Sequence, residues 1–248
     1  MNIGYYISGV AGQMSQNKLD NIAHNMANTN TVGYMEGRTS FSSTMSGTTG
    51  SVGSPGNTSA AYLSMGDQYI STKAGNIRQT NGNLDFAIHG NGYFRVRMKD
   101  GMEALSRAGN FKLDGSGNLL TQSDLAVLDQ GGNPIRLPVG KVSATADGSL
   151  YVNGKPIADL GIASIKDPRK IHKLPGVLIR TEQNNISPAN SSVSVHNGEL
   201  EDSNVNSVLA MTRIVNTMRS YQSMMKVLQQ YNQISAQLSD RVGSVQGL

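Results

Sequence analysis

Apolar residues follow a helical period at both ends of the chain, and the first such segment spans residues 2–28. Spacings of three and four residues recur there, with one shift after Met14, so the apolar side chains share one narrow helix face. The apolar positions are Ile3, Ile7, Val10, Met14, Leu19, Ile22 and Met26. Because Gly4, Gly9 and Gly12 would each weaken an isolated helix by roughly 1 kcal/mol relative to Ala, we predict an amphipathic helix that needs a packing partner.

The longest periodic segment starts near residue 203, and no Pro or Gly interrupts it between residues 204 and 242. Its apolar positions are Ile214, Met218, Tyr221, Met225, Leu228, Tyr231, Ile234, Leu238 and Val242. A helix of this length extends about 58 Å. Burial of these side chains would contribute about 15–25 kcal/mol, which is less than the cost of ordering about forty residues. The sequence therefore predicts a coiled-coil-like layer with the N-terminal helix and with neighbouring subunits.

Between the helical segments, short apolar runs alternate with glycine-containing turns. Three turns are the pairs Asp114-Gly115, Asp147-Gly148 and Asn153-Gly154, and two more contain Gly90-Asn91-Gly92 and Gly131-Gly132-Asn133. Asn-Gly and Asp-Gly pairs tolerate the positive φ angles that tight hairpins require. Turns this frequent, without a helical period between them, predict an all-β middle domain of short hairpins.

The segment from residue 39 to residue 56 is rich in Ser, Thr and Gly and shows no period, so we expect an extended arm without packed structure. Together these patterns predict an α+β fold with four regions. They are an N-terminal helix with its exit turn (1–36), an extended arm or linker (37–74), a β domain (75–190) and a C-terminal helical region (191–248).

Charge and cysteine content exclude several classes of function. Charged residues make up 15% of the chain, and the formal net charge of +4 is scattered rather than gathered in a patch typical of nucleic-acid binding. The chain has no Cys, which rules out disulfides and zinc–cysteine sites. Residues 1–14 lack the basic and apolar regions of a secretory signal, and no stretch approaches the length of a membrane span. We expect a protein that is not embedded in a membrane.

Candidate chemistry is sparse. The four histidines, His24, His89, His172 and His196, show no metal-binding spacing along the sequence. Asp114–Asn118 faintly resembles a calcium loop, but Leu125 stands where the bidentate Glu belongs, so a hairpin turn is the better interpretation. Glu199, Glu201 and Asp202 precede the last helix, where negative charge would favour its N-terminal dipole. The sequence predicts no catalytic, cofactor or metal site and no small-molecule substrate.

Residues 22–34, IAHNMANTNTVGY, resemble the N-terminal signature of the flagellar rod and hook protein family, A-x-N-[LM]-A-N-x-x-T-x-G-[FY]. Residues 82–96, 106–121 and 198–206 are similar to further stretches of the same family, in the same order along the chain. The signature positions are Ala23, Asn25, Met26, Ala27, Asn28, Thr31, Gly33 and Tyr34. Within the family, the chain is most similar to the proximal rod type, with the distal rod type as the alternative.

The resemblance implies a structural, non-enzymatic subunit of the bacterial flagellar basal-body rod, located in the cell envelope. It implies unfolded export through the flagellar type III machinery without a cleaved signal, and helical assembly with itself and with neighbouring rod proteins. The terminal helices would line the hollow rod, and Asn28, Thr31 and Gly33 would form the turn that leaves the first helix. A different class, a secreted β-rich adhesin or binding module, would need clustered exposed aromatic residues, whereas only 5% of residues are aromatic.

Overall fold

The computed structural model describes residues 3–46, 60–189 and 192–245, and the chain divides into two compact units. The helical unit contains Met1–Met26, Thr39–Gln68 and Ser207–Leu248, and the β unit contains Ala27–Arg38 and Tyr69–Asn206. The prediction of an α+β fold with a helix at each end and a β-rich middle is confirmed. Neither unit is continuous in sequence, because the chain enters and leaves the β unit twice.

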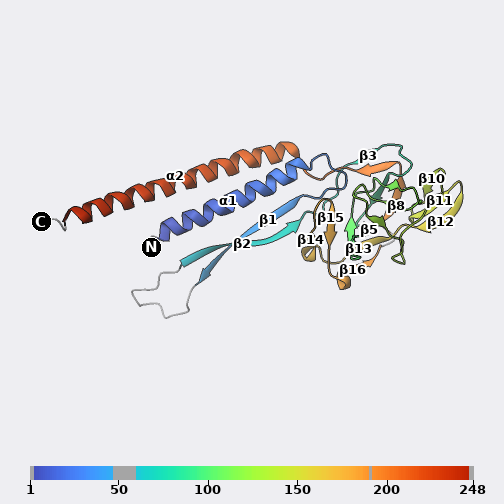
Figure 1. Ribbon diagram of the computed structural model, residues 1–248, viewed down its shortest axis with the longest axis horizontal. Coiled ribbons are helices and arrows are strands. Elements are labelled where there is room, and N and C mark those ends of the chain that lie inside the picture. The colour runs from blue at the N-terminus through green and yellow to red at the C-terminus, as the bar shows by residue number, and fades with distance from the viewer. Residues whose placement is uncertain (1–2, 47–59, 190–191, 246–248) are drawn as a thin grey trace. The chain divides into compact units, whose positions relative to one another are not determined.

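The helical unit contains α1 (Ile3–Ala27) and α2 (Ser207–Val245), which lie side by side (Figure 1). Both helices follow the predicted segments to within a few residues. Strands β1 (Gly37–Ser46) and β2 (Ala60–Ile70) pair with each other in a two-stranded sheet. The expected unpacked arm is therefore paired β structure where it is described, while residues 47–56 of the Ser/Thr/Gly-rich stretch lie outside the described residues.

The β unit consists of short strands, as the frequent turns predicted (Figure 1). Two short 3-10 helices, Pro168–Lys170 and Gln183–Asn185, lie between its later strands. The strands are β3 (Ile77–Gln79), β4 (Phe86–His89), β5 (Tyr93–Arg97), β6 (Glu103–Ser106), β7 (Lys112–Leu113), β8 (Leu119–Leu120), β9 (Ala126–Val127), β10 (Val142–Ala144), β11 (Ser149–Val152), β12 (Lys155–Asp159), β13 (Ile162–Ile165), β14 (His172–Lys173), β15 (Leu178–Arg180), β16 (Ile186–Pro188), β17 (Ser194–Asn197) and β18 (Glu199–Glu201).

Most of these strands join one nine-stranded sheet in the order β14-β15-β6-β5-β9-β8-β7, with β13 pairing both β5 and β16. A three-stranded sheet, β10-β11-β12, and the pairs β4–β17 and β3–β18 complete the unit. The main core lies among these sheets, where Phe94 and Phe111 meet edge-to-face at 5.1 Å between ring centroids. Aromatic pairs of this geometry stabilise a core beyond the area they bury.

Several predicted turns close hairpins between neighbouring strands. Asn153 and Gly154 both have positive φ, +51° and +80°, and join β11 to β12. Asp114 joins β7 to β8, and its Oδ1 accepts hydrogen bonds of 2.8 Å from the backbone N–H groups of Ser116 and Asn118. This hairpin turn, rather than a calcium loop, explains the Asp114–Asn118 sequence.

The turn at Gly90-Asn91-Gly92 does not close a hairpin. Strand β4 before it pairs with β17, and β5 after it pairs with β6, β9 and β13. Residues 194–201, expected in the C-terminal helical region, form β17 and β18 instead, because Val195 and Leu200 are buried in the β unit. Gly198, at a φ of +79°, makes the turn between these two strands. The last helix consequently starts at Ser207 rather than near residue 203.

Candidate functional site

The apolar face of α1 is partly covered. Met14 and Ile22 are buried, Val10 and Leu19 are half-buried, and Met26 is 36% exposed. The side chains of Ile3 and Ile7 lie outside those that the structure describes. A groove of about 450 Å³ runs between Met14 and Lys18 of α1 and Arg213 and Thr217 of α2. The two helices therefore cover part of each other and leave an open seam.

The predicted apolar positions of α2 fall on two different faces. Ile214, Tyr221, Leu228 and Tyr231 are half-buried and lie in line with the buried Ala210 and Thr217. In contrast, Met218, Met225 and Ile234 are exposed, and the side chain of Leu238 is outside the described set. The single stripe expected from the sequence thus separates into a covered face and an open one.

The open face includes residues that the sequence prediction did not assign. Val208, Met211 and Val215 are 73%, 57% and 47% exposed. Together with Met218 and Met225 they form one line along the helix, with successive spacings of three, four, three and seven residues. Spacings of this kind keep side chains on one side of a helix. We call these five residues the open α2 face. Large apolar side chains gathered on one exposed helix face are typical of an interaction surface.

The signature residues lie at the end of α1 and in the turn that follows it. Ala23 and Ala27 are exposed, and the buried Asn25 side chain donates a 3.0 Å hydrogen bond to Asn21. The backbone N–H of Thr31 donates to the carbonyl of Asn28, and that of Tyr34 donates to the carbonyl of Thr31, each at 3.2 Å. The motif therefore forms a defined exit from the helix.

Gly33 is the most constrained residue of this turn. Its φ is +66°, and a Cβ atom built on it would overlap the backbone N of Ala108 and lie 2.5 Å from the Cα of Ala108. Its N–H donates a 2.8 Å hydrogen bond to the carbonyl of Glu201. Only glycine satisfies both the left-handed backbone and this close approach.

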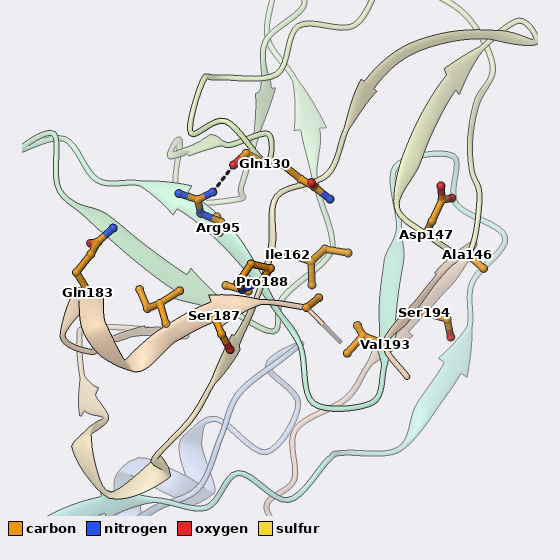
Figure 2. A pocket seen from close by; sticks show the side chains of 13 residues that line it. Arg95, Gln130, Ala146, Asp147, Ile162, Gln183, Ser187, Pro188, Val193 and Ser194 are labelled. Atoms are coloured by element: carbon orange, nitrogen blue, oxygen red, sulfur yellow. Dashed lines mark hydrogen bonds between the residues drawn. The ribbon is translucent and has the colours of Figure 1, made fainter. Parts of the chain in front are cut away.

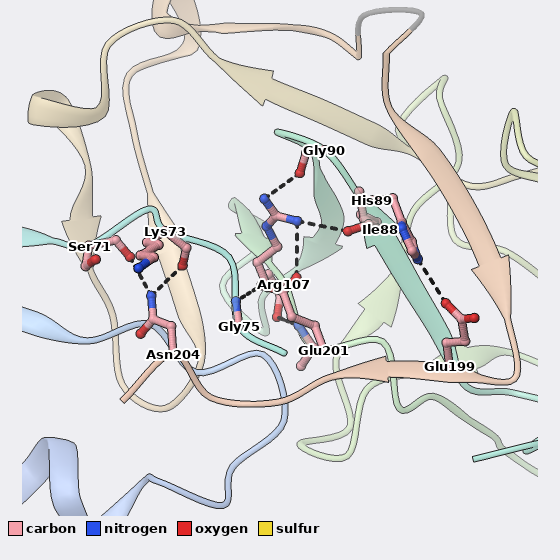
Figure 3. Close-up of polar contacts among 12 residues, drawn as sticks. Ser71, Lys73, Gly75, Ile88, His89, Gly90, Arg107, Glu199, Glu201 and Asn204 are labelled. Atoms are coloured by element: carbon pink, nitrogen blue, oxygen red, sulfur yellow. Dashed lines mark hydrogen bonds and ion pairs between the residues drawn. The ribbon is translucent and has the colours of Figure 1, made fainter. Parts of the chain in front are cut away.

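Three chain segments meet around that turn within the β unit: residues 27–38, 69–76 and 199–206, which we call the junction. Asn204 connects all three, because its Oδ1 accepts a 2.7 Å hydrogen bond from the N–H of Glu36 and its Nδ2 donates to the carbonyls of Ser71 and Lys73 (Figure 3). A buried or half-buried amide that satisfies backbone groups in this way fixes the path of each segment.

A buried ion pair lies beside Asn204. Arg107 is 3% exposed and Glu201 is 4% exposed, and Arg107 Nη1 lies 3.2 Å from Glu201 Oε2. Arg107 also donates hydrogen bonds to the carbonyls of Ile88 and Gly90, and Glu201 Oε1 accepts one from the N–H of Gly75 (Figure 3). Both terminal guanidinium nitrogens and both carboxylate oxygens thus have hydrogen-bond partners, which offset part of the desolvation of the pair.

The carboxylates before α2 do not act on the helix dipole. Glu199 bonds His89, Glu201 bonds Arg107, and Asp202 Oδ1 lies 3.4 Å from Arg78 Nε. The first turn of α2 contains no acidic residue. Glu199 and Glu201 are the first and last residues of β18, and residues 202–206 separate this strand from the helix start. These three residues instead stabilise pairing within the β unit.

Lys173, the last residue of β14, binds to the junction through its ammonium group. Its Nζ donates to the Tyr34 hydroxyl at 2.7 Å and to the carbonyl of Met35 at 3.2 Å, and it lies 3.9 Å from the centroid of the Tyr34 ring. Burial lowers the pKa of Lys173 from 10.5 to about 8, because the charged form loses hydration. Burial, and then the nearby Glu36 carboxylate, raise the pKa of Tyr34.

This lowered pKa predicts that stability increases as the pH rises. Between about pH 8 and pH 10 the unfolded chain binds more protons at Lys173 than the folded chain does, so the free energy of unfolding should increase with pH in that window. Urea denaturation at pH 8, 9 and 10 measures this slope. Lys173→Met should remove the increase, whereas Lys155→Met, at a lysine of β12 outside the junction, should retain it. If the free energy of unfolding changed equally with pH in the two variants, Lys173 would not be the source of the increase.

A pocket of about 720 Å³ opens on the β unit between β5, β13 and β16 (Figure 2). Its charged side chains already have partners, since Arg95 bonds Glu103 and the carbonyl of Gln130, and Asp147 bonds Thr145 and Ser149. The remaining lining is apolar or neutral, including Ile162, Pro188 and Val193. Among the described lining residues no two carboxylates are paired, and Ser194 Oγ, at the edge of the pocket, lies 3.3 Å from Nε2 of the exposed His196. Among the described residues, no helix combines the length and apolar character that crossing a membrane requires.

Two family models match the chain. Residues 87–152 match the flagellar hook protein FlgE/F/G D1 domain, which covers the strands from β4 to β11. Residues 196–241 match the C-terminal region of the flagellar basal body rod FlgEFG proteins, which covers the last part of the junction and most of α2.

Curated relatives extend this similarity over nearly the whole chain. The flagellar basal-body rod protein FlgF of Rhizobium meliloti is 31% identical over 231 residues, covering 89% of this chain and 90% of the relative. FlgF of Mesorhizobium japonicum is 31% identical over 98% of this chain and 99% of the relative. The rod protein FlgG of Bacillus subtilis is 32% identical over 93% and 96%. The chain belongs to the family of flagellar basal-body rod proteins.

Proposed function

We propose that this chain is a structural subunit of the flagellar basal-body rod and polymerises helically through its two terminal helices. The main support for polymerisation is the open α2 face. Its five large apolar side chains point to solvent along a helix of 39 residues, and α1 covers a different face of that helix. Burial of each such side chain against a neighbouring subunit would contribute about 1.5–3 kcal/mol.

The same geometry supports a coiled-coil-like layer. α1 lies along the side of α2 that contains Arg213 and Thr217. Ile214 and Tyr221, next to that side around the helix, are half-buried, and the open face follows them. A helix with two adjacent apolar faces can contact one partner in its own chain and another in the next subunit. Repetition of that second contact without closure generates a helical assembly.

Within the rod, we propose the proximal position for this subunit. Support comes from the two relatives named FlgF, each matched at 31% identity over most of both chains. The distal position is the second candidate, because a relative named FlgG matches at 32% identity over comparable shares. Localisation of the fluorescently or antibody-labelled chain along purified basal bodies distinguishes the two.

The proposed partners are further copies of the chain, neighbouring rod proteins and the flagellar type III export machinery. The proposed location is the basal body in the cell envelope. The role is structural and not enzymatic. In support, the relatives are named as flagellar basal-body rod proteins, and large apolar side chains lie exposed on the surface of α2.

Met218→Asp tests the assembly proposal. It places a charge in the centre of the open α2 face, so rod assembly and swimming should be lost while the purified monomer keeps its β unit. Ser223→Asp is the matched control, because it adds the same charge at an exposed polar position of the same helix. Motility in soft agar and electron microscopy of basal bodies give the readout. Normal rods in Met218→Asp cells would refute the proposed surface.

A further inference from the structure

Two of the four histidines come together with a carboxylate on the β unit. His89 lies at the end of β4, His196 lies in β17 and Glu199 opens β18. One nitrogen from each imidazole and one oxygen of Glu199 all lie within 4.8 Å of one another. The imidazole rings are 4.2 Å apart between centroids, and His89 Nε2 lies 2.9 Å from Glu199 Oε2 (Figure 3).

Strand pairing fixes this arrangement. In the β4–β17 ladder His89 is opposite Ser194, and His196 is two residues further along the same strand. The two histidines are therefore diagonal neighbours on one face of the pair, within reach of each other's rings. Val195 and Ile88, on the other face, are each 2% exposed and hold the ladder in the core. The turn at Gly198 then brings Glu199 back beside His89.

We propose that His89, His196 and Glu199 bind a divalent transition-metal ion of the zinc type. Two imidazole nitrogens and one carboxylate oxygen form a mixed donor set that suits Zn²⁺ and related ions, whereas Mg²⁺ and Ca²⁺ require oxygen ligands. A tetrahedral zinc ion holds its ligand atoms about 3.4 Å apart. The three donor atoms lie within 4.8 Å of one another and would have to take up that separation when the ion binds.

The surroundings fit a metal ligand set. His196 Nε2 lies 3.3 Å from Ser194 Oγ, a contact that can orient the ring. The side chains of His89 and Glu199 are 41% and 27% exposed, so water can occupy the remaining coordination positions. A bound ion would link β4, β17 and β18. It would thereby reinforce the strand that carries Glu201 into the junction.

Zinc titration of the full-length protein without a polyhistidine tag tests the site. Calorimetry with ZnCl₂ at pH 7.5 should show one ion per chain, and neither MgCl₂ nor CaCl₂ should bind. His196→Ala, His89→Ala and Glu199→Gln should each weaken zinc binding at least about tenfold. Zinc binding should also weaken as the pH falls, because protons compete with the metal for the imidazole nitrogens.

His172→Ala is the matched control, because it removes an exposed histidine of β14 that lies outside the cluster. Its zinc affinity should equal that of the wild type. Co²⁺ should give the visible absorption of a low-coordinate site in the wild type and in His172→Ala, and this signal should be lost in His196→Ala. His196 is exposed, so this variant should fold, which its circular dichroism checks. Absence of saturable zinc binding by the wild type, or equal affinity in His196→Ala and His172→Ala, overturns the proposal.

Discussion

Arg107→Met is expected to lower the free energy of unfolding of the β unit by about 3–5 kcal/mol, because it leaves Glu201 as a buried carboxylate without its counter-charge. The carbonyls of Ile88 and Gly90 lose their hydrogen-bond donors in the same step. Urea denaturation followed by tyrosine fluorescence measures the loss, since the chain has 9 Tyr and no Trp.

Arg78→Met is the matched control for that experiment. Arg78 pairs with Asp202 at 3.4 Å, but the two side chains are 56% and 39% exposed, so the loss should stay within about 1 kcal/mol. Arg107→Met/Glu201→Leu should recover part of the stability, because neither charge is then left unpaired in the interior. A single Arg107→Met variant as stable as Arg78→Met would contradict the role of the buried pair.

Gly33→Ala is expected to cost at least about 2 kcal/mol. The substitution adds left-handed backbone strain and forces the turn away from the backbone of Ala108. Gly101→Ala separates these two effects, since Gly101 has a φ of +83° but nothing within 4 Å of a built Cβ. Gly101→Ala should lower the free energy of unfolding only by the cost of left-handed backbone strain, about 1–2 kcal/mol. Thermal and urea unfolding of both variants give the comparison, and equal losses would show that the contact with Ala108 is unimportant.

Local patterns predicted the elements of this fold well. The run without Pro or Gly at the C-terminal end gave a helix of 39 residues, and the Asn-Gly and Asp-Gly pairs marked hairpin turns such as β11–β12. These features depend on residues close in sequence, whose spacing determines side-chain direction and backbone φ. The placement of Gly33 in the exit turn came instead from the family resemblance, and its positive φ and close approach to Ala108 explain why glycine is required there.

Pairing between distant segments could not be predicted in this way. Strand β4 pairs with β17, more than a hundred residues later, so nothing near His89 indicates that His196 and Glu199 will lie beside it. The division of the α2 stripe has a related cause. A strict helical period places Val208, Met211 and Val215 on an apolar face of their own, but only the position of α1 determines which face is covered. Similarly, the positions of Glu199 and Glu201 just before the last helix suggest charges that stabilise the helix N-terminus. The sequence does not show that both residues belong to β18.

The junction also affects how fast the chain can fold. The bond from Gly75 to Glu201 joins residues 126 positions apart, and the bond from Glu36 to Asn204 joins residues 168 apart. Contacts of such long sequence separation must overcome a large loop-closure entropy before they contribute stability, and they slow folding. We therefore expect these contacts, and the positions of the segments that border both helices, to form late in folding.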